Sequence, residues 1–305
     1  MHRQRDFLLS VILAAAAASP ALGQMVAPAV GPSNSATQGD AAIPDFSGVW
    51  SHPYFPGFEP PASGPGPVLN RSRLPDGVAN FQQMIGDYTN PILKPQAAEV
   101  VKKHAEMELN GVATPTPSSQ CWPSGLPYIF FQVGMLMLQQ PEKITILYLQ
   151  DHEIRHVRMN QRHPEHVTPS WYGDSVGHYE GNTLLIDTVG IKTGPFAMID
   201  MYGTPYTKAL HVVERYRLLD YEAAKEGLER NAKENYRLAP DDNYRGKHFQ
   251  LEFTVEDVGV FTVPWSATVT YRHRPAGWPE NVCAENTLFY PEKDAAVPRA
   301  DKPDF

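Results

Sequence analysis

Apolar and polar residues alternate along most of the second half of the chain, with the period of two that β-strands show. Residues 183–189 are an example, because Leu184, Ile186 and Thr188 alternate with Leu185 and Asp187. Runs of this kind, rich in β-branched and aromatic residues, are bounded by turn-forming residues. The pattern predicts strands at residues 128–139, 144–149, 153–159, 174–179, 183–189, 210–218, 249–255 and 261–272.

These strands follow one another with few intervening helices, which is typical of antiparallel neighbours in a meander. We therefore expect an all-β fold, either an antiparallel β-barrel or a strongly curved sheet of about eight strands. A barrel of that size holds one small ligand. The Gly48-Val49-Trp50 sequence at the first ordered element is similar to the Gly-x-Trp signature of lipocalin-like barrels, which implies the same architecture.

Two segments interrupt the strand pattern. Residues 95–109 begin with a proline and precede Gly111, which predicts a helix in an N-terminal helical and irregular extension. Residues 221–238 read as a helical insertion between two strands. We expect one β-rich domain at residues 43–291, after a disordered linker at 24–42 and before a charged C-terminal tail at 292–305.

Residues 1–23 have the features of a secretory signal peptide. Arg3 and Arg5 precede an apolar run at 7–18, and Ala21-Leu22-Gly23 resembles a cleavage site, which predicts a mature start near Gln24. The apolar run is shorter than the roughly 20 residues of a membrane-spanning helix. We therefore expect a periplasmic or secreted protein without integral membrane association.

The charge of the chain bears on which partners it binds, and its cysteines bear on the redox compartment in which it folds. The formal net charge is −8 and no basic tract is present, which argues against nucleic acid as a partner. Cys121 and Cys283 are the two cysteines of the chain. In an oxidising compartment they most simply form a disulfide, although two free buried cysteines fit the sequence as well.

Residues 171–188 concentrate ionisable side chains on a predicted hairpin, whose turn lies at Gly181-Asn182. Alternation places Asp174 and His178 on one face of the first arm. In the second arm, Asp187 shares a face with Leu185. Asp187 then either accepts hydrogen bonds from a loop or an arginine, or is an acid of raised pKa inside a cavity.

In the predicted strand at 210–218, Glu214 lies on one face, and His211 and Arg215 lie on the other. Glu214 lies in the more apolar set, so we expect it inside the barrel, paired with an arginine from another strand. A structural ion pair is one interpretation. The other is that Glu214 and Asp187 are the buried carboxylates of a site.

Histidine spacing gives little support for a metal. The pairs His152/His156 and His163/His166 have no neighbouring cysteine or acidic motif that completes a ligand set, and we expect neither a metal nor a cofactor. Ser175 lacks the Gly-x-Ser-x-Gly context of a hydrolase nucleophile. No phosphate-binding loop or dinucleotide fingerprint is present.

At residues 171–188 the chain resembles a family of secreted, mostly uncharacterised bacterial proteins that carry the signature W-Y-G-D-S-x-G-x-W-E-G-D-T-L-x-x-D-T. Tyr179 and Asn182 replace the usual tryptophan and aspartate. Further similar motifs lie at 121–127, 162–164, 210–216, 255–257, 264–265, 283 and 285–286. The resemblance implies a secreted β-rich domain and says little about activity. The insertion at 221–238 departs from the family pattern.

These observations leave two functions open. One is a cofactor-independent lyase, isomerase or hydrolase that performs acid–base chemistry on a small apolar or aromatic molecule in a barrel cavity. The other is a periplasmic protein that binds such a ligand without turnover. In the enzyme, the expected proton carriers are Asp174, His178, Asp187, His211 and Glu214. The residues expected to orient the substrate are Trp171, Tyr172 and Arg215.

Overall fold

A computed structural model of the chain describes residues 43–52, 57–112, 114–131, 134–150, 153–234, 244–274 and 281–283. The chain divides into two units, Met1–Asp40 and Ala41–Phe305, and every described residue belongs to the second. The predicted signal peptide, linker and C-terminal tail lie outside the described residues, as do His152 and residues 235–238 of the helical insertion.

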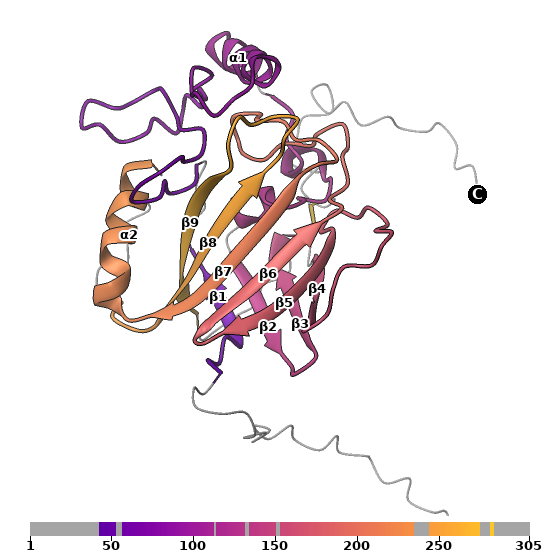
Figure 1. Cartoon of the computed structure of the whole chain (residues 1–305). Coiled ribbons are helices and arrows are strands. Elements are labelled where there is room, and N and C mark those ends of the chain that lie inside the picture. Colours follow the sequence, from indigo (N-terminus) through magenta and orange to yellow (C-terminus); the bar gives the residue numbers. More distant parts are fainter. Residues whose placement is uncertain are drawn as a thin grey trace, which may run out of the picture. The chain divides into compact units, whose positions relative to one another are not determined.

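Nine strands form a closed barrel in which each strand pairs with the next and β9 pairs with β1 (Figure 1). The strands are β1 (Gly48–Ser51), β2 (Gly134–Gln139), β3 (Lys143–Tyr148), β4 (Ile154–Met159), β5 (Asp174–Glu180), β6 (Thr183–Val189), β7 (His211–Leu219), β8 (His248–Glu256) and β9 (Trp265–His273). The predicted all-β barrel is confirmed, with one strand more than the approximate number expected.

Two details differ from the expectation. Residues 128–139 are not one strand, because Tyr128–Phe131 form a 3-10 turn, η2, before β2 begins. The barrel is also not wholly antiparallel. Strands β4 and β5 run parallel and pair over only three residues, Val157–Met159 with Ser175–Gly177. Residues 160–173 carry the chain back along β4, so Ser175, the second residue of β5, pairs with Val157 in the middle of β4.

Aromatic side chains occupy much of the barrel interior. Trp50 stacks on Phe249 with ring centroids 5.0 Å apart, and Tyr216 lies 5.0 Å from the same ring. The alternation predicted for β6 is confirmed, because Leu184, Ile186 and Thr188 are all 0% exposed. Burial of these apolar surfaces is the main force that holds the barrel together.

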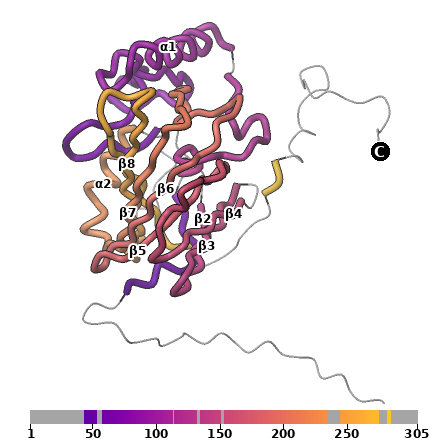
Figure 2. The backbone as a smooth tube through the Cα atoms, turned by 45° about the vertical axis from the view of Figure 1, so that its right-hand side comes forward, coloured from indigo at the N-terminus to yellow at the C-terminus, as the bar shows by residue number. Residues whose placement is uncertain are grey.

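The two α-helices lie on the outside of the barrel. Helix α1 (Pro95–Leu109) has the predicted bounds. It lies at one end of the strands in both views (Figures 1 and 2), where the Lys94 backbone N–H donates to the Val260 carbonyl. Helix α2 (Tyr221–Glu234), the described part of the insertion, packs against β7, β8 and β9.

Helix α2 covers a buried carboxylate. Glu59 is 0% exposed and its backbone bonds to that of Thr268 on β9. Arg230 of α2 lies 3.1 Å from Glu59 Oε1, which ties the helix to the barrel wall. Gly227 fits the close approach, since a Cβ there would lie 3.2 Å from the same oxygen.

The predicted hairpin and the predicted disulfide are both present. Gly181 takes a φ of +58° in the turn between β5 and β6, which glycine adopts at little cost. Cys121 follows the 3-10 turn η1 (Ser118–Gln120) and forms a disulfide with Cys283. Within the ranges that the structure describes, neither helix combines the length and the apolar character needed to span a membrane.

Candidate functional site

The short parallel ladder leaves an open groove in the barrel wall, which we call the seam groove. Its volume is about 510 Å³ and its lining residues are Pro123, Glu153, Ile154, Arg155, His156, Arg158, Ser170, Trp171, Tyr172, Gly173, Asp174 and Ser175. Residues of β4 that precede the ladder form one wall, and the segment that leads into β5 forms the other.

Gly173 fixes the course of the second wall. It has a φ of +62°, and a Cβ at this position would lie 2.4 Å from the Val189 carbonyl oxygen. No other residue fits such a contact without displacing the backbone. The glycine thus sets where Tyr172 and Asp174, its neighbours in sequence, enter the groove.

Tyr172 and Glu153 form a hydrogen-bonded pair across the groove, in which the phenol donates to Glu153 Oε2. The Tyr172 ring stacks on Tyr148, with ring centroids 5.6 Å apart, which orients the phenol. A phenol and a carboxylate in direct contact supply a proton donor and a proton acceptor at one place. Sequence reasoning named Tyr172 and missed Glu153, which lies in a short turn with no motif around it.

Asp174 is a carboxylate of the groove that two basic side chains contact. Arg158 Nη2 donates to both its oxygens, at 2.9 and 2.7 Å, and His163 Nδ1 lies 2.6 Å from Oδ2. Both partners come from outside the predicted site, Arg158 from β4 and His163 from the 160–173 connection. Asp174 is thereby held in one orientation at the edge of the groove.

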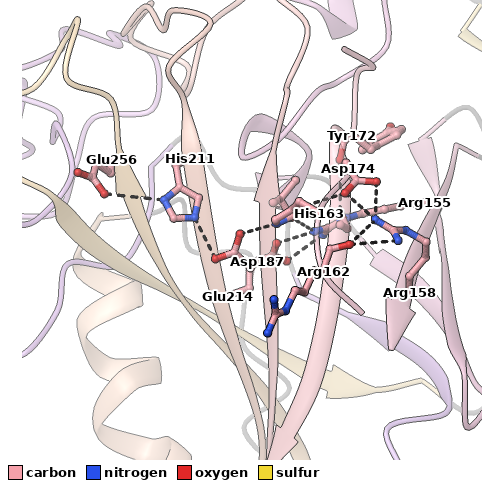
Figure 3. Close-up of polar contacts among 12 residues, drawn as sticks. Arg155, Arg158, Arg162, His163, Tyr172, Asp174, Asp187, His211, Glu214 and Glu256 are labelled. Carbon is pink, nitrogen blue, oxygen red and sulfur yellow. Dashed lines mark hydrogen bonds and ion pairs between the residues drawn. The ribbon is translucent and has the colours of Figure 1, made fainter. Parts of the chain in front are cut away.

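His163 links Asp174 to a second carboxylate on the outer face of the barrel (Figure 3). Its Nε2 lies 2.8 Å from Asp187 Oδ1, while Nδ1 faces Asp174. Both ring nitrogens of His163 therefore face a carboxylate oxygen, and the ring bridges Asp174 and Asp187.

The chain of contacts continues across β6, β7 and β8. His211 Nε2 lies 3.0 Å from Asp187 Oδ2, and His211 Nδ1 lies 3.8 Å from Glu256. The hydrogen bond from His211, with that from His163, lowers the pKa of Asp187 from its ordinary value. The same bond to Asp187 raises the pKa of His211. We call Arg158, Asp174, His163, Asp187, His211 and Glu256 the outer-face network.

Glu214 faces the barrel interior, as predicted, and is paired with Arg155 of β4. The Arg155 and Glu214 side chains are 1% and 0% exposed, and Arg155 Nη2 lies 2.6 Å from Glu214 Oε1. Tyr216 also donates to Glu214, at 2.6 Å. The remaining donors of Arg155 reach Ser175, Thr188 and Tyr148. The interpretation as a structural ion pair is therefore the one that the geometry supports.

The hypothesis that Asp187 and Glu214 form one pair of buried carboxylates is wrong. Asp187 lies on the outer face with its side chain 41% exposed, whereas Glu214 is inside. The register pairs Ile186 with Glu214 and Asp187 with Val213, so the pleat directs the two carboxylates to opposite faces. The lowered pKa of Asp187 also contradicts the raised-pKa interpretation.

The other predicted site residues are spread over two places. Trp171, Tyr172 and Asp174 line the seam groove, whereas Asp187 and His211 join it only through His163. His178 and Arg215 lie on exposed positions of β5 and β7 outside the groove, and His178 contacts Glu180 at 3.1 Å. Arg155, Arg158 and His163 were not among the predicted site residues. His163 was marked by the 162–164 motif and by its spacing from His166, and Arg155 is the arginine expected to pair with Glu214, whereas no motif pointed to Arg158.

A metal site is not formed by the side chains that the structure describes, since no group of three or more His, Cys, Asp or Glu residues converges on one point. The ring nitrogens of His163, one of the histidines with ligand-like spacing, face two aspartates instead. Of the other pair, His152 lies outside the described residues.

Comparison with known proteins does not link this site to a known family. No family model matches the chain, and no curated protein or solved structure shows significant similarity to it.

Proposed function

We propose that the protein is a cofactor-independent enzyme that moves protons on a small apolar or aromatic molecule bound in the seam groove. The observation that carries the proposal is the Tyr172–Glu153 pair, a phenol that donates to a carboxylate inside a groove also lined by Trp171 and Asp174. This site differs from the barrel cavity expected from the sequence. Most inward side chains named above pack against one another, whereas the groove is open.

The pair supports a proton-shift reaction, as in an isomerase or a lyase. Glu153 takes a proton from one atom of the substrate, and Tyr172 gives its phenolic proton to another atom. The hydrogen bond between the two side chains then returns the proton from Glu153 to Tyr172. The cycle ends with both residues in their starting forms, and no outside oxidant or reductant is required.

Asp174 has a separate role in this proposal. Its oxygens are fixed by Arg158 and His163, so it offers a rigid acceptor that orients a substrate hydroxyl or amine. Asp187 and His211 act as positioning residues, because they hold His163 from its other side and do not line the groove. In this proposal, Asp174 and Arg158 are the members of the outer-face network that touch substrate, and the other members hold them in position.

Solvent deuterium incorporation tests this function. Small aromatic ketones, phenols and aromatic amino alcohols are incubated with the protein in D₂O and followed by NMR. The proposal predicts that the protein accelerates exchange of carbon-bound protons in at least one compound. Asp174→Asn should raise KM more than it lowers kcat. Compounds that bind with no exchange would overturn the enzyme and leave the ligand-binding alternative.

Export of the protein is part of the same proposal. The Cys121–Cys283 disulfide supports it, since such bonds persist in oxidising compartments. N-terminal sequencing of the protein recovered from the periplasmic and extracellular fractions of a bacterial host tests it. We expect the sequence to start near Gln24. An uncleaved N-terminus with both cysteines reduced would contradict export.

A further inference from the structure

Three aromatic side chains form a cluster at the edge of the seam groove, which we call the aromatic rim. Trp122 meets Trp171 edge to face, with ring centroids 5.6 Å apart, and meets Phe196 in the same way at 5.9 Å. Trp122 remains 37% exposed. Part of the Trp122 indole is therefore accessible beside the groove, where an aromatic ligand can pack against it.

The rim is held in place by several independent contacts. The disulfide at Cys121 anchors the residue that precedes Trp122, and the Leu126 backbone N–H donates to the Trp171 carbonyl at 3.4 Å. Gly194 leaves room for the indole of Trp171, since a Cβ there would lie 2.7 Å from Cη2. A rim fixed in this way loses little conformational freedom when a ligand binds.

Trp171 and Pro123 connect the rim with the groove, because both line it. Trp171 packs against the Trp122 ring, and Pro123 follows Trp122 in sequence. The groove volume of about 510 Å³ falls within the range of small-molecule sites. Tyr172 and Asp174 follow Trp171 on the wall that leads into β5, and Glu153 precedes β4 on the other wall. The groove therefore places polar groups next to an aromatic edge.

We propose that the substrate has two parts, a flat aromatic group that packs on the aromatic rim and a hydroxyl or carbonyl group that meets Tyr172 and Glu153. Trp122 is then a specificity-determining residue of the site. Edge-to-face and offset contacts favour an aromatic ring over a saturated ring of equal size. The substrate class rests on the function proposed above, and measured affinities test it separately from catalysis.

Two bicyclic alcohols of the same carbon skeleton serve as probes, the aromatic 2-naphthol and the saturated 2-decalol. Isothermal titration calorimetry with the intact, oxidised protein measures both. We expect 2-naphthol to bind about tenfold more tightly than 2-decalol. Trp122→Ala should weaken 2-naphthol about tenfold and remove the preference, and Trp122→Phe should restore most of it. Leu138→Ala, which truncates an exposed apolar side chain on β2, is the matched control and should leave both affinities unchanged.

The inference is overturned if 2-naphthol does not bind, if 2-decalol binds as tightly, or if Trp122→Ala leaves the preference intact while the near-ultraviolet circular dichroism shows a folded protein. These outcomes are separate from the fate of the proposed enzyme. Selective binding of 2-naphthol in a protein that catalyses no exchange would support the substrate class and refute the function. Exchange activity insensitive to Trp122→Ala would support the function and refute the substrate class.

Discussion

Arg155 and Glu214 form a two-pronged ion pair inside the barrel, with Nη1–Oε2 and Nη2–Oε1 distances of 2.9 and 2.6 Å. Strands β4 and β7, which carry them, are not neighbours in the sheet. The pair therefore links two strands that are separated by β5 and β6, and the Arg155 guanidinium also donates to Ser175, another lining residue of the seam groove, at 3.0 Å.

Removal of one partner should be far more harmful than removal of both. Glu214→Gln leaves a buried guanidinium without a counter-charge and should reduce the free energy of unfolding by about 3–5 kcal/mol. The double variant Arg155→Met with Glu214→Leu has no buried charge and should be more stable than Glu214→Gln. Urea denaturation measures both. A loss below about 1 kcal/mol for the single variant would show that the pair contributes little.

The disulfide should account for a large part of the stability. Cys121 and Cys283 are separated by 162 residues in sequence, and in the chain-entropy model a crosslink of that span stabilises the fold by about 5 kcal/mol. The double variant Cys121→Ser with Cys283→Ser should show a correspondingly lower unfolding midpoint than the oxidised protein. The wild-type protein measured in a dithiol reductant is the control and should match the variant. Equal midpoints in oxidised and reduced protein would refute this role.

His211 and Asp187 should give the outer-face network a defined pH window. The raised pKa of His211 makes its contribution complete below its unfolded value of 6.5 and removes it as the pH rises through the folded pKa. The lowered pKa of Asp187 makes its contribution complete above 3.8 and removes it as the pH falls through the folded pKa. The pair therefore stabilises the fold most between these two values.

His211→Gln tests this window through melting temperatures measured from pH 4 to pH 9. The difference between wild type and variant should be largest near pH 5–6 and should shrink above neutrality. Lys143→Gln, an exposed position on β3, is the control for a general effect of charge. A wild-type-to-variant difference that stays constant over the whole range would contradict the network.

Glu59, buried beneath α2, should also make stability fall as the pH rises. Burial, opposed by Arg230, raises its pKa from 4.5 to about 7, with Glu226 of α2 adding to the increase. The folded protein therefore holds this proton more tightly than the unfolded chain, and stability falls as the pH rises from 4.5 to 7. Glu59→Gln should be on the order of 2 kcal/mol more stable relative to wild type at pH 8 than at pH 4. An unchanged difference between the two pH values would refute the assignment.

Alternation along single strands predicted which residues of a strand share a face, because side-chain direction follows from the pleat. It placed Glu214 inside with Tyr216, but it did not settle which face of β6 is the interior one, and Asp187, expected as a second buried carboxylate, lies on the outer face. It also predicted the hairpin turn at Gly181, since the required backbone conformation favours glycine. These features depend on short-range geometry, which a sequence displays directly.

The groove and the outer-face network could not be predicted in the same way. Both depend on the course of residues 160–173, which brings β5 parallel to β4 and places His163 between Asp174 and Asp187. No local pattern in that connection specifies its path. The pairing of Tyr172 with Glu153 follows from the same crossing, so the predicted site contained one partner of the pair and lacked the other.

The central claim is that Glu153 and Tyr172 transfer protons in the seam groove. Its most direct test is the rate of deuterium incorporation into the best compound of the exchange panel, compared between wild type, Glu153→Gln and Glu180→Gln. Glu180 is an exposed carboxylate at the end of β5, outside the groove. The account predicts that Glu153→Gln lowers kcat at least about 100-fold while Glu180→Gln keeps the wild-type value. A Glu153→Gln protein that remains folded and exchanges at the wild-type rate would contradict it.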